Sequence, residues 1–222
     1  MKSLTLNPMK SLTLNVAVCL MLGLASTSRG QVITLEPDNY TNGTVLNHIV
    51  LEVSLITAGT DNLPITPVSF DVTATDDPLL YTSTGTRVFG HQGTYFMNDI
   101  RRLRLDFSGL VSSLSLDFIG SGFPLLPERG HLEVYTAENV LLDSFVTPVP
   151  GAGEVVTMSL NHPTSDIAWA VAWSEGLTYG RLDNLVFSQP VLVPEPSSMA
   201  LVAAGGCVLG MLRWLRRRWP RV

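Results

Sequence analysis

Short apolar runs with a period of two are the feature that most constrains how this chain can fold. Between residues 31 and 190, apolar side chains alternate with polar ones, and glycine, proline, asparagine and aspartate separate the runs. This alternation places one face of each run in a core and the other in water, as in a β-strand. None of these runs has the 3.6-residue period of an amphipathic helix. We therefore expect an all-β body.

The runs are short and evenly spaced, and they predict nine or ten strands. The clearest are 49–55, 68–74, 103–107, 114–118, 132–136, 141–146, 155–160, 167–173 and 182–188. Strands of this length are typical of a β-sandwich or jelly roll rather than of a parallel sheet. The echo of Leu-Arg-Leu-Asp-Phe (103–107) in Leu-Ser-Leu-Asp-Phe (114–118) predicts two adjacent strands around the turn at 108–110.

The charge of the chain is unevenly distributed. Residues 31–193 contain six arginines, no lysine and eighteen acidic residues, which gives this segment a formal charge of −12. A body this acidic argues against nucleic acid as a partner, because phosphate binding needs clustered Lys and Arg. Both cysteines, Cys19 and Cys207, lie in apolar terminal segments. The body must therefore be stabilised by its core rather than by disulfides.

The N-terminal segment has the order of a secretory signal peptide. The heptapeptide Met-Lys-Ser-Leu-Thr-Leu-Asn occurs at residue 1 and again at residue 9, so the true start is either Met1 or Met9. Lys10 precedes an apolar stretch at 16–25, and the small residues Ser28 and Gly30 stand at −3 and −1 of a cut before Gln31. This pattern predicts removal of residues 1–30 during export.

The C-terminal segment has three consecutive parts. Pro194, Glu195 and Pro196 come first, and an uncharged apolar run follows at 199–212. A basic cluster then ends the chain, formed by Arg213, Arg216, Arg217, Arg218 and Arg221. The apolar run is slightly short of the ~20 residues that comfortably span a bilayer, but snorkelling flanks compensate for such a deficit. We expect a transmembrane helix whose arginine end stays in the cytoplasm.

This order resembles the PEP-CTERM sorting signal of bacterial envelope proteins, and the resemblance covers only residues 193–222. It implies recognition by an exosortase, a membrane enzyme thought to cut near Pro-Glu-Pro and to release or transfer its substrate. It also implies a bacterium that makes exopolysaccharide. An ordinary C-terminal anchor that happens to carry two prolines is the alternative.

No motif in the body marks an enzyme. The four histidines, His48, His91, His131 and His162, do not form a zinc-binding spacing, and no Gly-x-Ser-x-Gly elbow is present. Eighteen acids could supply a carboxylate pair for glycoside hydrolysis, but nothing in the sequence singles out a pair. A non-enzymatic protein is therefore expected, and a glycan hydrolase with an unmarked site is the alternative.

Acidic residues near the first and last strands suggest a structural calcium site. Glu36, Asp38 and Asn39 come at the first strand, and Asp183 and Asn184 lie in Leu-Asp-Asn-Leu-Val-Phe (182–187) at the last one. First and last strands of a sandwich often lie together, so Glu36 and Asp183 could share one hard cation. The closing hexapeptide resembles the last strand of galactose-binding-like jelly rolls. That resemblance implies a Ca²⁺ between first and last strands and a carbohydrate-binding role.

Aromatic residues are the remaining candidates for ligand contact. Trp169 and Trp173 are predicted to share a strand face with Ile167 and Val171, which favours the core over an exposed sugar platform. Five further aromatic residues near glycines are better placed for ligands, namely Tyr81, Phe89, Tyr95, Phe96 and Tyr179.

Together these features predict a signal peptide at 1–30, a β-sandwich at 31–190 and a sorting segment at 191–222. We expect an exported envelope or extracellular-matrix protein, anchored in the membrane before processing, whose sandwich binds polysaccharide. A purely structural surface protein without a ligand is a further alternative.

Overall fold

The computed structural model describes residues 30–65, 70–122 and 127–190, which belong to one compact unit, Gly30–Pro190. The predicted signal peptide and sorting segment, including Pro194–Pro196 and the arginine cluster, lie outside these residues. Within the described ranges, no helix is long and apolar enough to cross a membrane.

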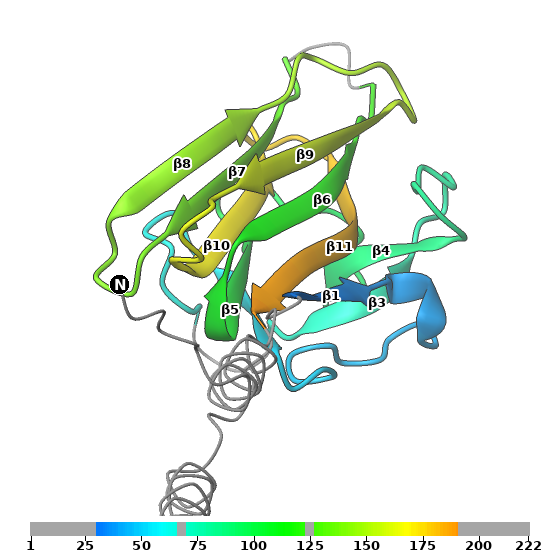
Figure 1. The fold of residues 1–222 in the computed structure, drawn as a ribbon. Coiled ribbons are helices and arrows are strands. Elements are labelled where there is room, and N and C mark those ends of the chain that lie inside the picture. The colour runs from blue at the N-terminus through cyan, green and yellow to red at the C-terminus, as the bar shows by residue number, and fades with distance from the viewer. Residues whose placement is uncertain (1–29, 66–69, 123–126, 191–222) are drawn as a thin grey trace, which may run out of the picture. The chain divides into compact units, whose positions relative to one another are not determined.

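Two antiparallel sheets pack face to face as a β-sandwich (Figure 1). The six-stranded sheet has the order β3 (Val72–Asp76), β4 (Arg87–His91), β11 (Arg181–Pro190), β6 (Ser113–Ile119) and β9 (Val155–Asn161), and β1 (Gly30–Leu35) also pairs with β11. The five-stranded sheet has the order β2 (Val53–Ala58), β5 (Arg102–Val111), β10 (Ile167–Ser174), β7 (Gly130–Tyr135) and β8 (Leu141–Val146). The one helical element among the described residues is the 3₁₀ turn η1 (Pro37–Asn39), so the all-β prediction is confirmed.

The core lies between the sheets and follows the alternation of the sequence. In the five-stranded sheet, the register places Leu55, Leu105, Ala170 and Val134 side by side in one row. All four are fully buried. The apolar period of two therefore selects the inward face, as a pleated strand requires.

β4 was not predicted, β1 was expected only as a first strand near Glu36 without bounds, and two strands begin later than predicted. Neither β1 nor β4 shows a long alternation between apolar and polar residues. β3 begins at Val72 rather than at residue 68. β2 begins at Val53 rather than at Ile49, and Leu51 is 91% exposed in the preceding turn. Val53 and Leu55 do face the core, as the pattern indicates.

The sequence echo at 103–107 and 114–118 does not form a hairpin. β5 continues to Val111, through the proposed turn at 108–110, and pairs with β2 and β10. β6 pairs with β11 and β9 in the other sheet. The prediction of two adjacent strands is therefore wrong, because the chain passes from one sheet to the other at Ser112. The similar sequences reflect similar burial in the two sheets.

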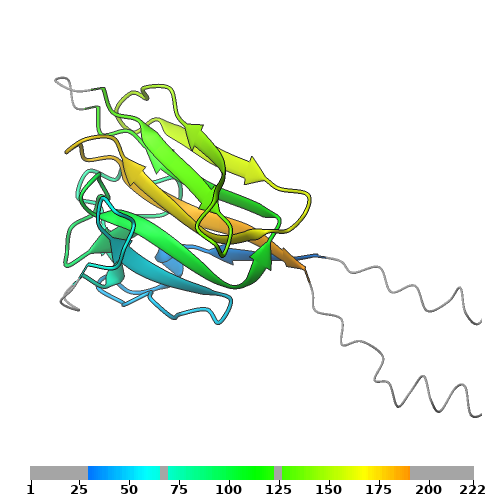
Figure 2. The same ribbon diagram turned by 90° about the vertical axis from the view of Figure 1, so that its left-hand side faces the viewer.

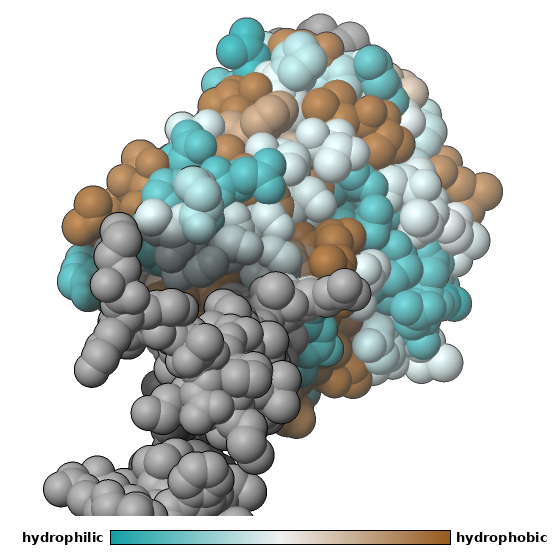
Figure 3. All heavy atoms as spheres, in the orientation of Figure 1, coloured by the Kyte–Doolittle hydropathy of each residue, from teal (hydrophilic) through white to brown (hydrophobic). Residues whose placement is uncertain are grey.

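The edge strand β8 combines exposed apolar side chains with an inward-facing charge. Val140, Leu141 and Val146 are 58%, 49% and 47% exposed, and Figure 3 shows hydrophobic residues along this edge. Asp143 lies opposite Val134, whose side chain faces the core. A charge on the inner face of an edge strand opposes pairing with another chain.

The two ends of the described domain leave the sandwich side by side. Gly30 is paired with Pro190 where β1 meets β11 (Figure 2). β11 then runs for ten residues, about 30 Å at the usual rise, to Arg181 at the opposite end. The loop between β10 and β11 lies at that far end (Figure 2). The sandwich thus has a proximal end, where the chain enters and leaves, and a distal end formed by loops.

Candidate ligand-binding surface at the distal end

A buried ion pair organises the distal end. Arg181, the first residue of β11, is 1% exposed, and its Nε lies 2.9 Å from Oδ2 of Asp77, which is also buried. The guanidinium carbon lies 5.0 Å from the ring centroids of both Tyr81 and Tyr95. Its Nη1 donates to the Tyr179 carbonyl oxygen at 2.9 Å. The cation is therefore enclosed by a carboxylate, a carbonyl and two aromatic rings.

Asp77 also shapes the loop 77–86 that joins β3 to β4. Its carboxylate accepts backbone N–H groups from Leu79 and Tyr81, at 3.0 and 2.9 Å. Its backbone carbonyl accepts the N–H of Leu80, whose φ of 57° is in the left-handed region. A leucine tolerates that region only when its surroundings impose it. Leu80 is nevertheless 65% exposed, so this strain is not compensated by burial of its side chain.

Two further carboxylates hold the second half of the same loop. Asp183 Oδ2 accepts the N–H and hydroxyl of Ser83, both at 2.9 Å, and the N–H of Thr84 at 3.3 Å. Asp38 Oδ1 accepts the N–H groups of Thr86 at 2.7 Å and Arg87 at 3.1 Å. The loop is thus fastened to β11 and to η1, and it presents its side chains on a fixed backbone.

Aromatic and aliphatic side chains gather around these anchors. The Tyr95 and Phe96 centroids lie 5.7 Å apart, and the Phe96 and Tyr179 centroids 4.8 Å, both edge to face. Tyr179 is 41% exposed, whereas Tyr81, Tyr95 and Phe96 are half-buried. We call the whole group the distal loop surface; it consists of Leu79, Leu80, Tyr81, Tyr95, Phe96, Leu177 and Tyr179, and its three leucines are exposed.

The two other loops of this surface are joined by reciprocal hydrogen bonds. The Asp99 N–H donates to the Gly176 carbonyl at 3.2 Å, and the Gly176 N–H donates to the Asp99 carboxylate at 3.0 Å. Loops 92–101 and 175–180 therefore hold a fixed relation to each other. Four of the five predicted loop aromatics meet here. The fifth, Phe89, is fully buried in β4, so its prediction as a ligand contact is wrong.

Glu36 and Asp183 come together as the sequence predicts. β1 pairs with β11 through Leu35 and Leu185, so the residue after β1 lies beside the start of β11. Burial raises the pKa of Asp183 to about 7, and the charge of Glu36 adds to this effect, while hydrogen bonds from Ser83 and Thr84 oppose it. Among the described residues, neither carboxylate forms an ion pair with a basic side chain.

This pair meets part of the requirement for calcium. Ca²⁺ takes six to eight oxygen ligands, and a cation would relieve the repulsion between Glu36 and Asp183. Asp38 is committed to backbone N–H groups, and Asn184 donates to Asp117 at 3.1 Å. In the described part of the chain, no three His, Cys, Asp or Glu side chains are grouped as a metal site. The remaining ligands would therefore be carbonyl or water oxygens.

The two tryptophans form a second cluster on the outer face of the five-stranded sheet. Trp169, Val171 and Trp173 are buried in a cluster separate from the inter-sheet core. A β-bulge between Ile167 and Trp169 turns Ile167 into the core instead. The prediction that all four share one face is therefore wrong at Ile167. The tryptophan side chains are nearly buried, with 7% and 6% exposure, but they lie on the outer face of the sheet and not between the two sheets.

Both faces of each tryptophan are occupied. Trp169 is stacked on Tyr135 with centroids 3.9 Å apart, and the Arg104 guanidinium lies 4.4 Å from its other face. Trp173 is stacked on His131 at 4.9 Å, with Arg102 at 4.0 Å. Stacking between neighbouring strands, which lie about 4.8 Å apart, makes these rings stand edge-on to the sheet. No free tryptophan face remains for a sugar ring.

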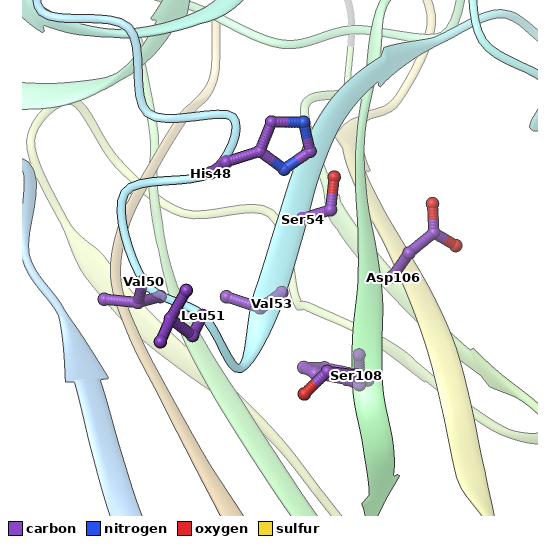
Figure 4. Close-up of a pocket in the computed structure, with 8 residues that line it drawn as sticks. His48, Val50, Leu51, Val53, Ser54, Asp106 and Ser108 are labelled. Carbon is purple, nitrogen blue, oxygen red and sulfur yellow. The ribbon is translucent and has the colours of Figure 1, made fainter.

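A small pocket of about 210 Å³ opens between β2 and β5 (Figure 4). Figure 4 shows His48, Ser54 and Asp106 on one side of it and Val50, Leu51 and Val53 on the other. Asp106 is engaged by Arg104 at 2.8 Å. Since no hydrogen bond joins His48, Ser54 and Asp106, their arrangement gives no sign of a nucleophilic triad.

Comparisons with known proteins give only distant similarities. No family model and no curated protein matches the sequence. Among solved structures, the K2 cleaved adhesin domain of Lys-gingipain is 13% identical with a TM-score of 0.45, covering 72% of this chain and 100% of that one. The K3 domain from Porphyromonas gingivalis w83 is 11% identical with a TM-score of 0.31, covering 61% and 98%. A carbohydrate-binding module of family 29 is 17% identical with a TM-score of 0.28, covering 61% and 88%. Such low scores are insufficient to assign a ligand or a function.

The sequence reasoning missed the ion pair at the centre of the distal end. Asp77 and Arg181 are 104 positions apart, and no local pattern links them. The one signal was that Arg181 directly precedes an apolar strand in a body with only six arginines. An arginine at such a position is a candidate for burial with a partner.

Proposed function

We propose that this protein is an exported, non-enzymatic surface protein that binds polysaccharide through its distal loop surface. The observation that carries the proposal is the gathering of Tyr81, Tyr95, Phe96 and Tyr179 on anchored loops, at the end opposite Gly30 and Pro190. Aromatic rings bind the C–H faces of sugars. Rigid loops lower the ordering cost of binding.

The chemistry beside these rings also suits a glycan. Residues 82–84 are Thr-Ser-Thr, and their hydroxyls donate to the Gly85 carbonyl, Asp183 and Asp38, which leaves their oxygen lone pairs as acceptors for sugar hydroxyls. A binding site that combines apolar contacts with a few placed polar groups is the usual arrangement for small ligands. We therefore assign the sugar contacts to loops 77–86, 92–101 and 175–180.

The hydrolase alternative is less well supported. Asp183 has the raised pKa and the neighbouring carboxylate that a glycosidase acid would need. Its side chain is fully buried, however, and its oxygens accept hydrogen bonds from Ser83, Thr84 and Asn184. A catalytic acid must reach the glycosidic oxygen, and Asp183 cannot do so without opening the loop.

We further propose that the chain is exported by its N-terminal segment and sorted through Pro194, Glu195 and Pro196, with an exosortase as processing partner. The arginines 213–218 would retain the tail at the membrane before processing. A Ca²⁺ bound between Glu36 and Asp183 would stabilise loop 77–86, because Asp183 accepts hydrogen bonds from Ser83 and Thr84 of that loop. These assignments rest on the order of sequence motifs and, for calcium, on the unpaired carboxylates.

The test is binding of the segment 30–190 to the host's exopolysaccharide by isothermal titration, with and without chelator. Phe96→Ala and Tyr179→Ala should each weaken binding by about 1–3 kcal/mol, the range for an aromatic contact at a binding site. Leu141→Ala, on the distant edge strand β8, is the matched control. Equal binding by all three variants would refute the distal loop surface as the site. Absence of binding by the wild type would favour a purely structural protein.

A further inference from the structure

The proximal end of the sandwich carries its own exposed apolar side chains. Val32, Leu51 and Leu110 are 67%, 91% and 47% exposed. A leucine as exposed as Leu51 is unusual where nothing covers it, and single exposed residues need no explanation unless they gather. The question is therefore whether these three lie on one surface.

Contacts along the chain place them together. Leu51 and Ser108 line the same pocket, and the Ser108 N–H donates to the Glu52 carbonyl at 2.9 Å. One residue further on, the Gly109 carbonyl accepts the Gln189 side-chain amide at 3.3 Å. Gln189 is paired with Gln31, next to Val32. Leu51, Leu110 and Val32 therefore surround the point where Gly30 and Pro190 leave the domain, and we call them the proximal surface.

The length of the following chain limits what this surface can face. Only eight residues separate Pro190 from Met199, where the uncharged apolar run begins. Even fully extended, the nine residue steps from Pro190 to Met199 reach about 30 Å. If that run spans a bilayer, the point where the chain leaves the domain, with the proximal surface around it, is held within this distance of the lipid.

We infer that the proximal surface rests on the lipid bilayer while the chain is anchored, with Leu51 entering the interfacial region. This inference depends on the proposed membrane anchor. The side chains that line the pocket beside Leu51 include no lysine or arginine, and the nearby Arg104 is paired with Asp106 at 2.8 Å, so the contact is apolar rather than electrostatic. Neutral lipid is therefore the expected partner, and anionic lipid should not strengthen the contact.

The experiment uses residues 31–222, the form that the proposed export would leave, with Cys207→Ser, so that one new cysteine can carry an environment-sensitive fluorophore. The label is placed at Leu51→Cys or, as a matched control, at Leu177→Cys in the distal loops, where the native leucine is 63% exposed. Equal melting temperatures of the two labelled proteins establish that both fold. Each is mixed with phosphatidylcholine vesicles, with and without brominated lipid, and separated by flotation.

The inference would be supported if both proteins float and only the label at position 51 responds to the vesicles. That label should emit at shorter wavelength and be quenched by brominated lipid, whereas the label at position 177 should not change. Flotation with identical emission at both positions would overturn it and leave the anchor intact. Failure to float would refute the anchor and, with it, the inference. A shift at position 51 without vesicles would assign the surface to a second copy of the chain, which also overturns the inference.

Discussion

The Glu36–Asp183 pair predicts a specific pH dependence of stability. Asp183 has a pKa of about 7 in the folded domain and an ordinary value of 3.8 when unfolded. Its folded form therefore holds a proton that the unfolded chain releases, and stability falls as pH rises from 3.8 towards 7. Between pH 5.5 and pH 8 the loss from this residue amounts to about 2 kcal/mol, or about 4–8 °C in Tm for a domain of this size.

Other groups change the raw pH profile and must be separated. His91 is fully buried, and burial lowers its pKa to about 4, with the positive charge of Arg101 adding to the effect. The unfolded chain binds a proton at His91 that the folded domain excludes, so this residue makes stability rise with pH up to about 6.5. The contributions of His91 and Asp183 therefore oppose each other between pH 5.5 and pH 6.5.

The informative quantity is the difference between Asp183→Asn and the wild type. The variant loses one charge and part of the acceptor capacity for Ser83 and Thr84, a cost that does not depend on pH. Relative to wild type, it should become more stable by about 2 kcal/mol between pH 5.5 and pH 8, because it lacks the buried charge. Differential scanning calorimetry at both pH values measures this. A difference that stays constant with pH would refute the raised pKa of Asp183.

Calcium provides a second arm of the same experiment. Ca²⁺ replaces the proton at a carboxylate pair, so it should raise the wild-type Tm more at pH 8 than at pH 5.5. Glu36→Gln and Asp183→Asn should abolish that increase. If Ca²⁺ leaves the wild-type Tm unchanged at pH 8, no calcium is held between these residues, and the pH dependence alone remains.

Three further predictions address the ion pair, the tryptophan face and the sheet edge, and a fourth addresses the tail. Asp77→Ala leaves Arg181 buried without its carboxylate, so it should lower the free energy of unfolding in urea by about 3–5 kcal/mol and speed proteolysis in loop 77–86. Unchanged stability would contradict the role of the ion pair. Trp169→Ala should cost about 3–5 kcal/mol by the same assay without reducing glycan binding, and lost binding in a folded variant would relocate the site. Asp143→Leu should promote self-association in analytical ultracentrifugation, since it removes the inward charge of β8, and a monomeric variant would argue against this. Alanine at residues 194–196 should leave unprocessed protein in the membrane fraction of a host with its exosortase, and unchanged processing would refute the sorting signal.

Local periodicity predicted the fold well where strands have one buried face. Leu103, Leu105, Leu114 and Leu116 alternate with polar residues, and all four are buried as expected. β1 was expected only without bounds, because it lies at the margin of the six-stranded sheet and buries only Ile33 and Leu35. The pattern of burial is a local property of a strand, so it can be read without knowledge of the partners.

Pairing between strands could not be read in the same way. β5 and β6 have nearly the same pattern and follow each other in sequence, yet they belong to different sheets. A pattern of burial specifies which side faces the core, and each of two opposed sheets satisfies it equally. The bulge before Trp169 shows the same limit, since one extra residue moved Ile167 to the opposite face.

The same difference between general and chain-specific information decides which candidate site the sequence could predict. Glu36 and Asp183 were found because a general property of sandwiches brings first and last strands together, and the pairing of β1 with β11 confirms it. Asp77 and Arg181 depend on the path of one particular loop. Their sequence separation hides them from any local argument, although they hold the distal loop surface in place.

The position of β11 couples folding of the domain to the proposed sorting step. β11 pairs with β1, β4 and β6, and it supplies both Arg181 and Asp183 to loop 77–86. The six-stranded sheet cannot be completed, and loop 77–86 cannot be anchored to Arg181 and Asp183, before this last strand is available. Because β11 closes contacts with the first strand of the domain, its pairing is among the most non-local and the slowest to form. Nine residues later the apolar run begins, so the proposed anchor directly follows the strand that completes the domain. A chain truncated before β11 would therefore lack both its folded distal end and the proposed address.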